Sequence, residues 1–266
     1  MSGRDPFEPE AILASGPFAG HRLDVTRFRS VRLLSQEEAA PYEHEPGERL
    51  AANFLHDGRW HIARIPPQPV AEVIVHVEHV AHSFPGAHAQ IRFRLLPGRG
   101  VVLLPQIPGY EPPRTELTDL IYTVEGNYAP GTSSTPAGGV EQSGIAYMLM
   151  SLDDKVRVMS VDGMLPTVHQ YRLVVATDKK QAVLQRALDI ATRAGSRKMF
   201  DLVTRNCTTE ALRVLDAALH YPTWRRMMTK LTYSGLPEAM RIYLAERGLL
   251  GPDSRLPDLG DDPTLV

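Results

Sequence analysis

The spacing of apolar residues changes near residue 177 and divides the chain into a strand-forming part and a helix-forming part. Before that point, short runs rich in Val and Ile are bounded by prolines and glycines, which is typical of β-strands. The residues Pro-Gly-Arg-Gly at 97–100 predict a turn that joins two of these runs into a hairpin. The expected strands are 70–80, 88–96, 101–104, 117–125, 144–152, 156–161 and 168–176.

After residue 177, apolar residues recur at helical spacing. They predict one helix that begins near Asp178 and ends before Gly195, and a second that follows Asn206 and ends before Pro222. Shorter helices are expected at 223–231 and 237–247, and the last 15 residues are expected to be disordered or loosely docked. Strands followed by helices predict an α+β fold, with an antiparallel sheet packed against helices.

Composition narrows the class of protein. The chain has 266 residues, 43% of them apolar, and a net charge of −2, so charge alone would recruit neither nucleic acid nor an anionic membrane. The single cysteine excludes an intramolecular disulfide and fits a reducing compartment. The first 20 residues do not resemble a secretory signal, and we find no apolar run of 18 residues. We therefore expect a cytoplasmic protein without a transmembrane segment and without a nucleic-acid partner.

The lone cysteine, Cys207, stands at the predicted start of a helix. Asn206 is a favourable N-cap and would place Cys207 in the first turn, where backbone N–H groups and the helix dipole stabilise a thiolate. The same N–H groups can donate to an oxyanion. A free cysteine is often only a small buried apolar residue. The polar neighbours Arg205, Thr208 and Thr209 favour a nucleophile instead.

A nucleophilic cysteine needs a base, and four histidines lie close together in the sequence. His88 follows a Pro-Gly turn at the head of a predicted strand and is the preferred base, with His82 in reserve. On a strand, His76 and His82 would share one face with Glu78, and His79 would take the other. A metal site is therefore not expected, although a helix over 76–82 would bring three histidines to one side.

The third member of the site is left open by the sequence. An amide or carboxylate commonly orients the base. Gln106 follows the expected strand 101–104 and is one candidate, and Glu78 or Asn206 could fill the same role. No cofactor is expected.

Three segments resemble the domain of the Lnb-type bacterial lipoprotein N-acyltransferase and its relatives. Residues 88–93 (HAQIRF) are similar to the family's H-x-x-L-R-F strand, and 204–209 (TRNCTT) to its N-N-C-T-T helix start. Residues 170–173 (QYRL) look like the strand before the cysteine helix. The resemblance covers roughly residues 76–219. The family typically carries a carboxylate on the strand after the histidine strand, where this chain offers Gln106.

The resemblance implies a circularly permuted papain-like fold, related to NlpC-type peptidases and lecithin:retinol acyltransferase. It implies an N-terminal extension and β-rich segment at 1–69, a catalytic core at 70–220, and a C-terminal helical extension and tail at 221–266. It also implies acyl transfer through a thioester on Cys207 with His88 as base, from an acyl-bearing substrate that could be a lipid. Two alternatives stay open: a binding module that retains the fold without catalysis, and a metal-dependent hydrolase using His76, His79 and His82.

Overall fold

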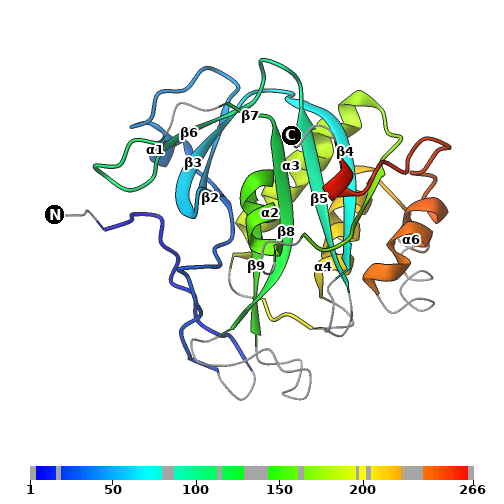
Figure 1. Ribbon diagram of the computed structural model, residues 1–266. Helices are drawn as coiled ribbons and strands as arrows, with labels where there is room; N and C mark the ends of the chain where they lie inside the picture. Colours follow the sequence, from blue (N-terminus) through cyan, green and yellow to red (C-terminus); the bar gives the residue numbers. More distant parts are fainter. Residues whose placement is uncertain are drawn as a thin grey trace.

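One large sheet dominates the computed structural model of this protein (Figure 1). In the described part of the chain its ten strands follow the order β10-β4-β5-β8-β9-β2-β3-β6-β7, with β1 paired to β2. The described residues are 4–15, 19–79, 87–112, 116–128, 143–160, 165–195, 198–201, 205–222, 224 and 236–262. The strands are β1 (Arg32–Leu33), β2 (Arg49–His56), β3 (Arg59–Ile65), β4 (Val70–His79), β5 (Ala87–Leu95), β6 (Val101–Pro105), β7 (Glu116–Leu117), β8 (Asp119–Tyr128), β9 (Ser143–Ser151) and β10 (Val168–Arg172).

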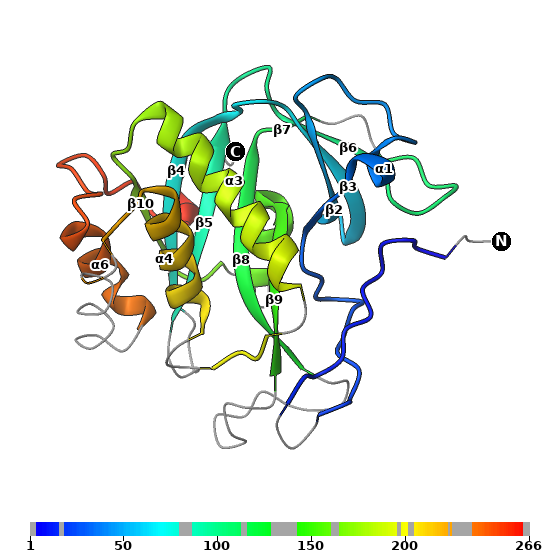
Figure 2. The ribbon, with the colours of Figure 1, turned by 180° about the vertical axis from the view of Figure 1, so that it is seen from behind.

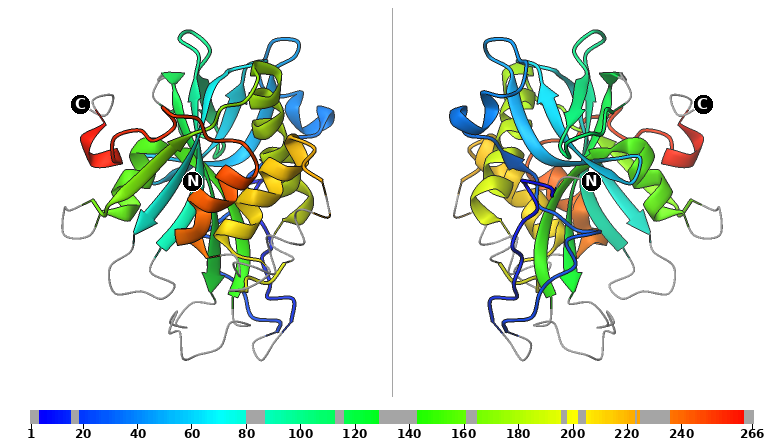
Figure 3. Two further views of the ribbon diagram at one scale, coloured as in Figure 1. Left: turned by 90° about the vertical axis from the view of Figure 1, so that its right-hand side faces the viewer. Right: turned by 90° about the vertical axis from the view of Figure 1, so that its left-hand side faces the viewer.

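Helices cover both faces of this sheet. The long helices α3 (Thr177–Ala194) and α4 (Cys207–Ala218) lie on one face (Figure 2). Helix α2 (Leu152–Met159) and residues 252–262, here called the C-terminal segment, lie on the other (Figure 3). The larger apolar cluster fills the space under α3, α4 and α6 (Met240–Glu246), and a smaller one lies under α2. The remaining short helices are α1 (Gln36–Ala39), η2 (Pro237–Ala239) and η3 (Leu259–Asp261).

The α+β class expected from the sequence is confirmed, and the sheet is mostly antiparallel. The pairing of β2 with β9 is parallel, whereas the other recorded pairs are antiparallel. Strands β2 and β3, from the segment 1–69, lie in the same sheet as the strands of 70–220. Across the ranges that the structure describes, no helix has both the length and the apolar composition needed to cross a bilayer.

Two local predictions from the sequence are wrong. Residues 156–159 belong to helix α2 rather than to a strand, because Ser151 caps the helix and Leu152, Val156 and Met159 fall on one helical face. The expected hairpin also does not form: β5 pairs with β4 and β8, while β6 pairs with β3 and β7. The turn at 97–100 therefore connects two strands that are not neighbours in the sheet.

The C-terminal segment is docked against the sheet through a buried ion pair. Asp262 Oδ2 lies 2.9 Å from Nη1 of Arg92, whose side chain is completely buried on β5. A second carboxylate, that of Asp119, lies 2.6 Å from Arg92 Nε. The expectation of a disordered or loose tail is thus wrong for residues 252–262, while 263–266 and most of the expected helix at 223–231 lie outside the described residues. The helix expected at 237–247 is confirmed as η2 followed by α6.

We expect Asp262→Ala to lower the free energy of unfolding by about 2 kcal/mol, because a buried guanidinium loses one of its two carboxylates. Urea denaturation followed by circular dichroism would measure the change. The neighbouring Asp261 is exposed, so Asp261→Ala is the matched control and should stay within about 0.5 kcal/mol of the wild type. Equal loss in both variants would contradict a specific role for the Arg92 pair.

Candidate active site

Cys207 is the first residue of helix α4, as expected. Asn206 is the N-cap: its Oδ1 accepts a hydrogen bond from Thr209 N at 2.9 Å, and Thr209 Oγ1 accepts one from Asn206 N at 2.8 Å. This reciprocal capping fixes the start of the helix and holds the Cys207 sulfur next to the first-turn amides. The cysteine is 6% exposed, so little solvent competes for its sulfur.

The sulfur approaches the sheet where two strands separate. The pairing of β5 with β8 begins at Ile91 and Tyr122, so the first residues of β5 are not paired to that neighbour. Two residues earlier, Ala89 N–H points to Cys207 Sγ at 3.5 Å rather than to a β8 carbonyl. The thiol of α4 therefore occupies a gap in the ladder, which brings it close to the side chain of His88.

His88 connects the cysteine to a carboxylate on the next strand. Its Nε2 lies 2.7 Å from Thr123 Oγ1 and 3.4 Å from Glu125 Oε1, and the Thr123 hydroxyl donates to Glu125 Oε1 at 2.7 Å. Because that hydroxyl donates to the carboxylate, it accepts from His88 Nε2–H, and Nδ1 is left for the cysteine. The Cys207 sulfur lies close enough to the imidazole for His88 to lower the pKa of the thiol. Continuing the β5–β8 register to the start of β5 places Glu125 opposite His88.

The electrostatics of these three groups favour charge separation. Burial alone would raise the pKa of Cys207, but the charge and hydrogen bond of His88 and the Ala89 amide outweigh it and lower that pKa. Burial lowers the pKa of His88, whereas the charges of Glu125 and Cys207 raise it to about 9. Burial likewise opposes ionisation of Glu125, yet His88 and Lys155 lower its pKa to about 2. A thiolate beside an imidazolium is the expected resting pair near neutral pH.

A cavity of about 450 Å³ lies beside His88, on the face of the sheet that α2 covers. One part of its wall is charged and carries His88, Glu125, Glu78 and Lys155. The other part is apolar and rich in methionine, whose flexible side chains adapt to ligands of different shape. The apolar wall is formed by Phe28, Leu55, Met148, Met150, Val158 and Met159.

Two of the predicted supporting residues lie elsewhere or act differently. Gln106 is buried at the end of β6, where it binds the Asn53 backbone at 2.7 Å and the Asp5 carboxylate at 3.0 Å. Four strands separate β6 from β5 in the sheet, so Gln106 cannot orient His88. Asn206 serves as the helix cap. His82 lies outside the described residues.

The histidines considered for a metal site diverge. Both described members, His76 and His79, are on β4, where alternation sends them to opposite faces as expected for a strand. Burial and the nearby Arg92 charge lower the pKa of His76 to about 3, so it is neutral. His79 packs edge-on against His169, with ring centroids 4.6 Å apart. Among the described residues, no three His, Cys, Asp or Glu side chains are placed to hold a metal ion.

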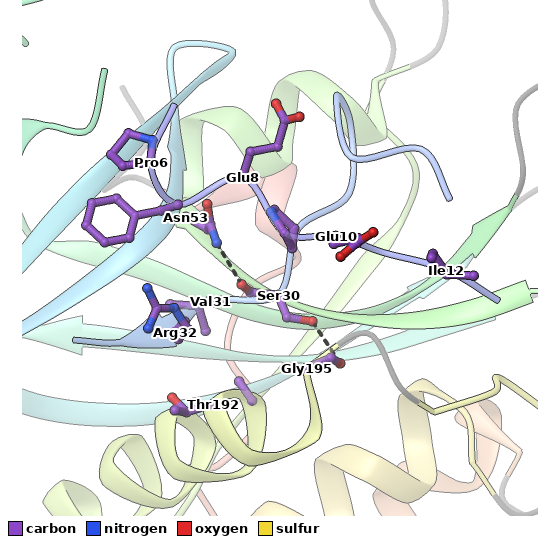
Figure 4. A pocket seen from close by; sticks show the side chains of 13 residues that line it. Pro6, Glu8, Glu10, Ile12, Ser30, Val31, Arg32, Asn53, Thr192 and Gly195 are labelled. Carbon is purple, nitrogen blue, oxygen red and sulfur yellow. Dashed lines mark hydrogen bonds between the residues drawn. The ribbon is translucent and has the colours of Figure 1, made fainter. Parts of the chain in front are cut away.

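A separate cavity of about 370 Å³ lies under the N-terminal segment (Figure 4). Ser30 links its walls, accepting from Asn53 Nδ2 at its carbonyl and donating from Oγ to the Gly195 carbonyl, each at 3.3 Å. Its lining includes the acidic Glu8 and Glu10 but neither Cys207 nor His88. It is therefore distinct from the candidate active site.

Sequence reasoning missed Glu125, Thr123 and Lys155. The first two belong to an expected strand, 117–125, but the sequence did not predict which strand lies beside it in the sheet. Lys155 directly precedes the segment 156–161, which was expected to be a strand, so the sequence did not predict that Lys155 lies on helix α2. The usable signal was the alternation of Thr123 and Glu125, which puts these two polar side chains on the same face of the strand.

Comparisons of this chain with models of protein families, with curated proteins and with solved structures find no match.

We expect Glu125→Gln to slow alkylation of Cys207 by iodoacetamide at pH 6 by about tenfold or more. The variant lacks the charge that most raises the pKa of His88. A smaller fraction of the imidazole is then protonated at pH 6, so the thiol loses part of the positive charge that lowers its pKa. Rates measured from pH 4 to 10 would show the change as an upward shift of the thiol titration.

Thr123→Val, which removes only the hydroxyl between His88 and Glu125, should give a smaller shift in the same direction. Glu111→Gln removes an exposed carboxylate and serves as the control. A Glu125→Gln profile that overlies that of the control would contradict the ion-pair arrangement.

Proposed function

We propose that this protein is a cysteine-dependent acyl-transfer enzyme, an acyltransferase or a hydrolase that works through a thioester. The observation that carries the proposal is the arrangement of His88 between Cys207 and the Thr123–Glu125 pair. A cysteine with only a packing role does not need a neighbouring imidazole, and that imidazole does not need a partly buried carboxylate beside it. Together they form the nucleophile, base and orienting group of thiol catalysis.

The proposed reaction has two steps. The Cys207 thiolate attacks the carbonyl carbon of an ester or amide, forming a C–S bond, and His88 gives its proton to the leaving alcohol or amine as the C–O or C–N bond breaks. An amine or water then attacks the thioester while His88 takes its proton, and the C–S bond breaks to restore the thiolate. Backbone N–H groups beside the sulfur, from Ala89 and the first turn of α4, are candidate donors to the oxyanion.

Two features bear on the resemblance to the Lnb-type acyltransferase domain and its permuted papain-like relatives. The histidine strand β5 precedes the cysteine helix α4 in the chain, which is the permuted order. A carboxylate, Glu125, lies on β8, which is adjacent to β5 in the sheet; the strand that follows β5 in the chain, where the family typically carries its carboxylate, is β6 and is followed by Gln106. We further propose that the reaction needs no cofactor and that the protein is cytoplasmic.

The cavity beside His88 supports an acyl-bearing substrate. Its charged wall holds the base, and its methionine-rich wall is apolar. An alkyl chain that binds along such a wall displaces water from it, which favours binding. We propose that the acyl chain of an ester, which could be a lipid, lies along this wall with its carbonyl directed to Cys207.

Intact-mass spectrometry after incubation with esters and phospholipids tests the proposal. We expect an added acyl mass on the wild-type protein that neutral hydroxylamine removes, as it does a thioester. The adduct should be absent from Cys207→Ala and reduced at least tenfold in His88→Gln. If none of these substrates modifies the wild type and Cys207→Ala is fully functional in its host, the protein is instead a binding module.

Two exposed valines allow a test of the cavity's role. Val158 lines the apolar wall and is 63% exposed, whereas Val174 is 62% exposed and is not part of that wall. We expect Val158→Glu to slow reaction with hexadecanoyl esters by about tenfold and to leave acetyl esters unaffected, because a carboxylate placed against an alkyl chain must be desolvated. Val174→Glu should change neither rate. Equal rates with both esters in Val158→Glu would contradict binding of the chain along this wall.

A further inference from the structure

Lys155 is a buried cation that the proposed reaction does not itself use. It lies on the inner side of helix α2, where its residue is 4% exposed. Its Nζ is 3.4 Å from Glu125 Oε1 and 3.4 Å from Glu78 Oε2, so it bridges carboxylates from two different strands. Burying an ammonium group is costly unless it is paired. Both of its partners lie next to the candidate base.

The two carboxylates flank His88 from opposite sides. Glu78 is its direct register partner on β4, and Glu125 approaches it from β8. Orienting an imidazole needs one carboxylate, and a second negative charge holds the proton on His88 more strongly. Other charged or titratable groups on this face are Glu72 and His76 on β4, Arg92 and Arg94 on β5, Asp119 on β8, Asp262 in the C-terminal segment and Arg27 at the rim of the cavity.

We propose that Lys155 and Glu78 are positioning residues that set how strongly His88 holds its proton, with Lys155 offsetting the charge of the second carboxylate. This inference rests on the proposed acyl-transfer function, because only a base that must release its proton each cycle needs such a balance. A base flanked by two uncompensated carboxylates would hold its proton too firmly to accept another from the incoming amine or water. Lys155 works through Glu125 and Glu78 without contacting the reacting atoms.

The directions of the charge effects agree with this arrangement. Burial has the largest effect on the pKa of His88 and lowers it, and the charge of Glu125 has the next largest effect and raises it. The Lys155 cation opposes Glu125 by lowering this pKa. Burial lowers the pKa of Lys155, but Glu125 and Glu78 together raise it, so the ammonium stays charged throughout the neutral range.

The test is the pH dependence of Cys207 alkylation by iodoacetamide in the full-length protein, combined with ¹⁵N NMR titration of His88. The wild type should show thiolate formation at low pH and loss of the imidazolium proton near pH 9. We expect Lys155→Met to raise this upper step by about one pH unit and Glu78→Gln to lower it by a similar amount. The double variant should return toward the wild-type value, because both charges are then absent.

Two controls separate this role from a structural one. Lys155→Arg keeps the charge and should restore the wild-type upper step, which a loss of packing would not predict. Arg157→Met removes a cation from the same helix, but that side chain is 59% exposed and should leave the step unchanged. The conservative Glu78→Gln keeps the test valid if Lys155→Met fails to fold.

The outcomes distinguish this inference from the function it rests on. If the wild type shows both steps but Glu78→Gln and folded Lys155→Met leave the upper one in place, the charge balance is wrong and the acyl-transfer proposal stands. If the wild-type thiol titrates in a single step near pH 8.5, as a free cysteine does, the proposed function is itself contradicted.

Discussion

The pairing of a thiolate with an imidazolium through a gap in the sheet is the interaction on which the proposed chemistry depends. It requires β5 and β8 to separate before Ile91, so that the start of α4 can present Cys207 to the Ala89 amide and to His88. A continuous ladder would occupy that amide with a strand carbonyl and exclude the sulfur. The local break in hydrogen bonding is therefore what joins a helix on one face to a charge cluster on the other.

That charge cluster shows why the opposite face of the sheet must be covered. Glu78, Glu125 and Lys155 are largely withdrawn from water under α2, and in this environment their interactions with His88 are stronger than they would be at the surface. The same face carries the buried Arg92, which the C-terminal segment neutralises through Asp262. Helix α2 and the C-terminal segment thus both enclose charges that the sheet alone would leave exposed or unpaired.

The wrong hairpin and the wrong candidate for the third member of the site share one cause. The turn at 97–100 was read as a hairpin because short turns usually join neighbouring strands. In the structure β6 pairs with β3, whose residues 59–65 are distant in sequence, and β8 takes the place beside β5. Because of this change of partner, four strands separate Gln106 from His88, and Glu125 lies next to His88 instead. The segment at 156–161 misled for a different reason, since its β-branched valines also fit one face of a short capped helix.

The sequence by itself determined the features that depend on neighbouring residues: the capped start of α4 with Cys207 in its first turn, the long helix α3, and the strand that carries His88 near its start. These follow from capping, periodicity and alternation, which act over a few residues. Only the tertiary structure decided which strand lies beside β5, and hence which carboxylate meets the imidazole. Strand pairing is set by burial and register across the whole sheet. Contacts such as Glu125 with His88 or Asp262 with Arg92 therefore cannot be predicted from the residues next to them in the sequence.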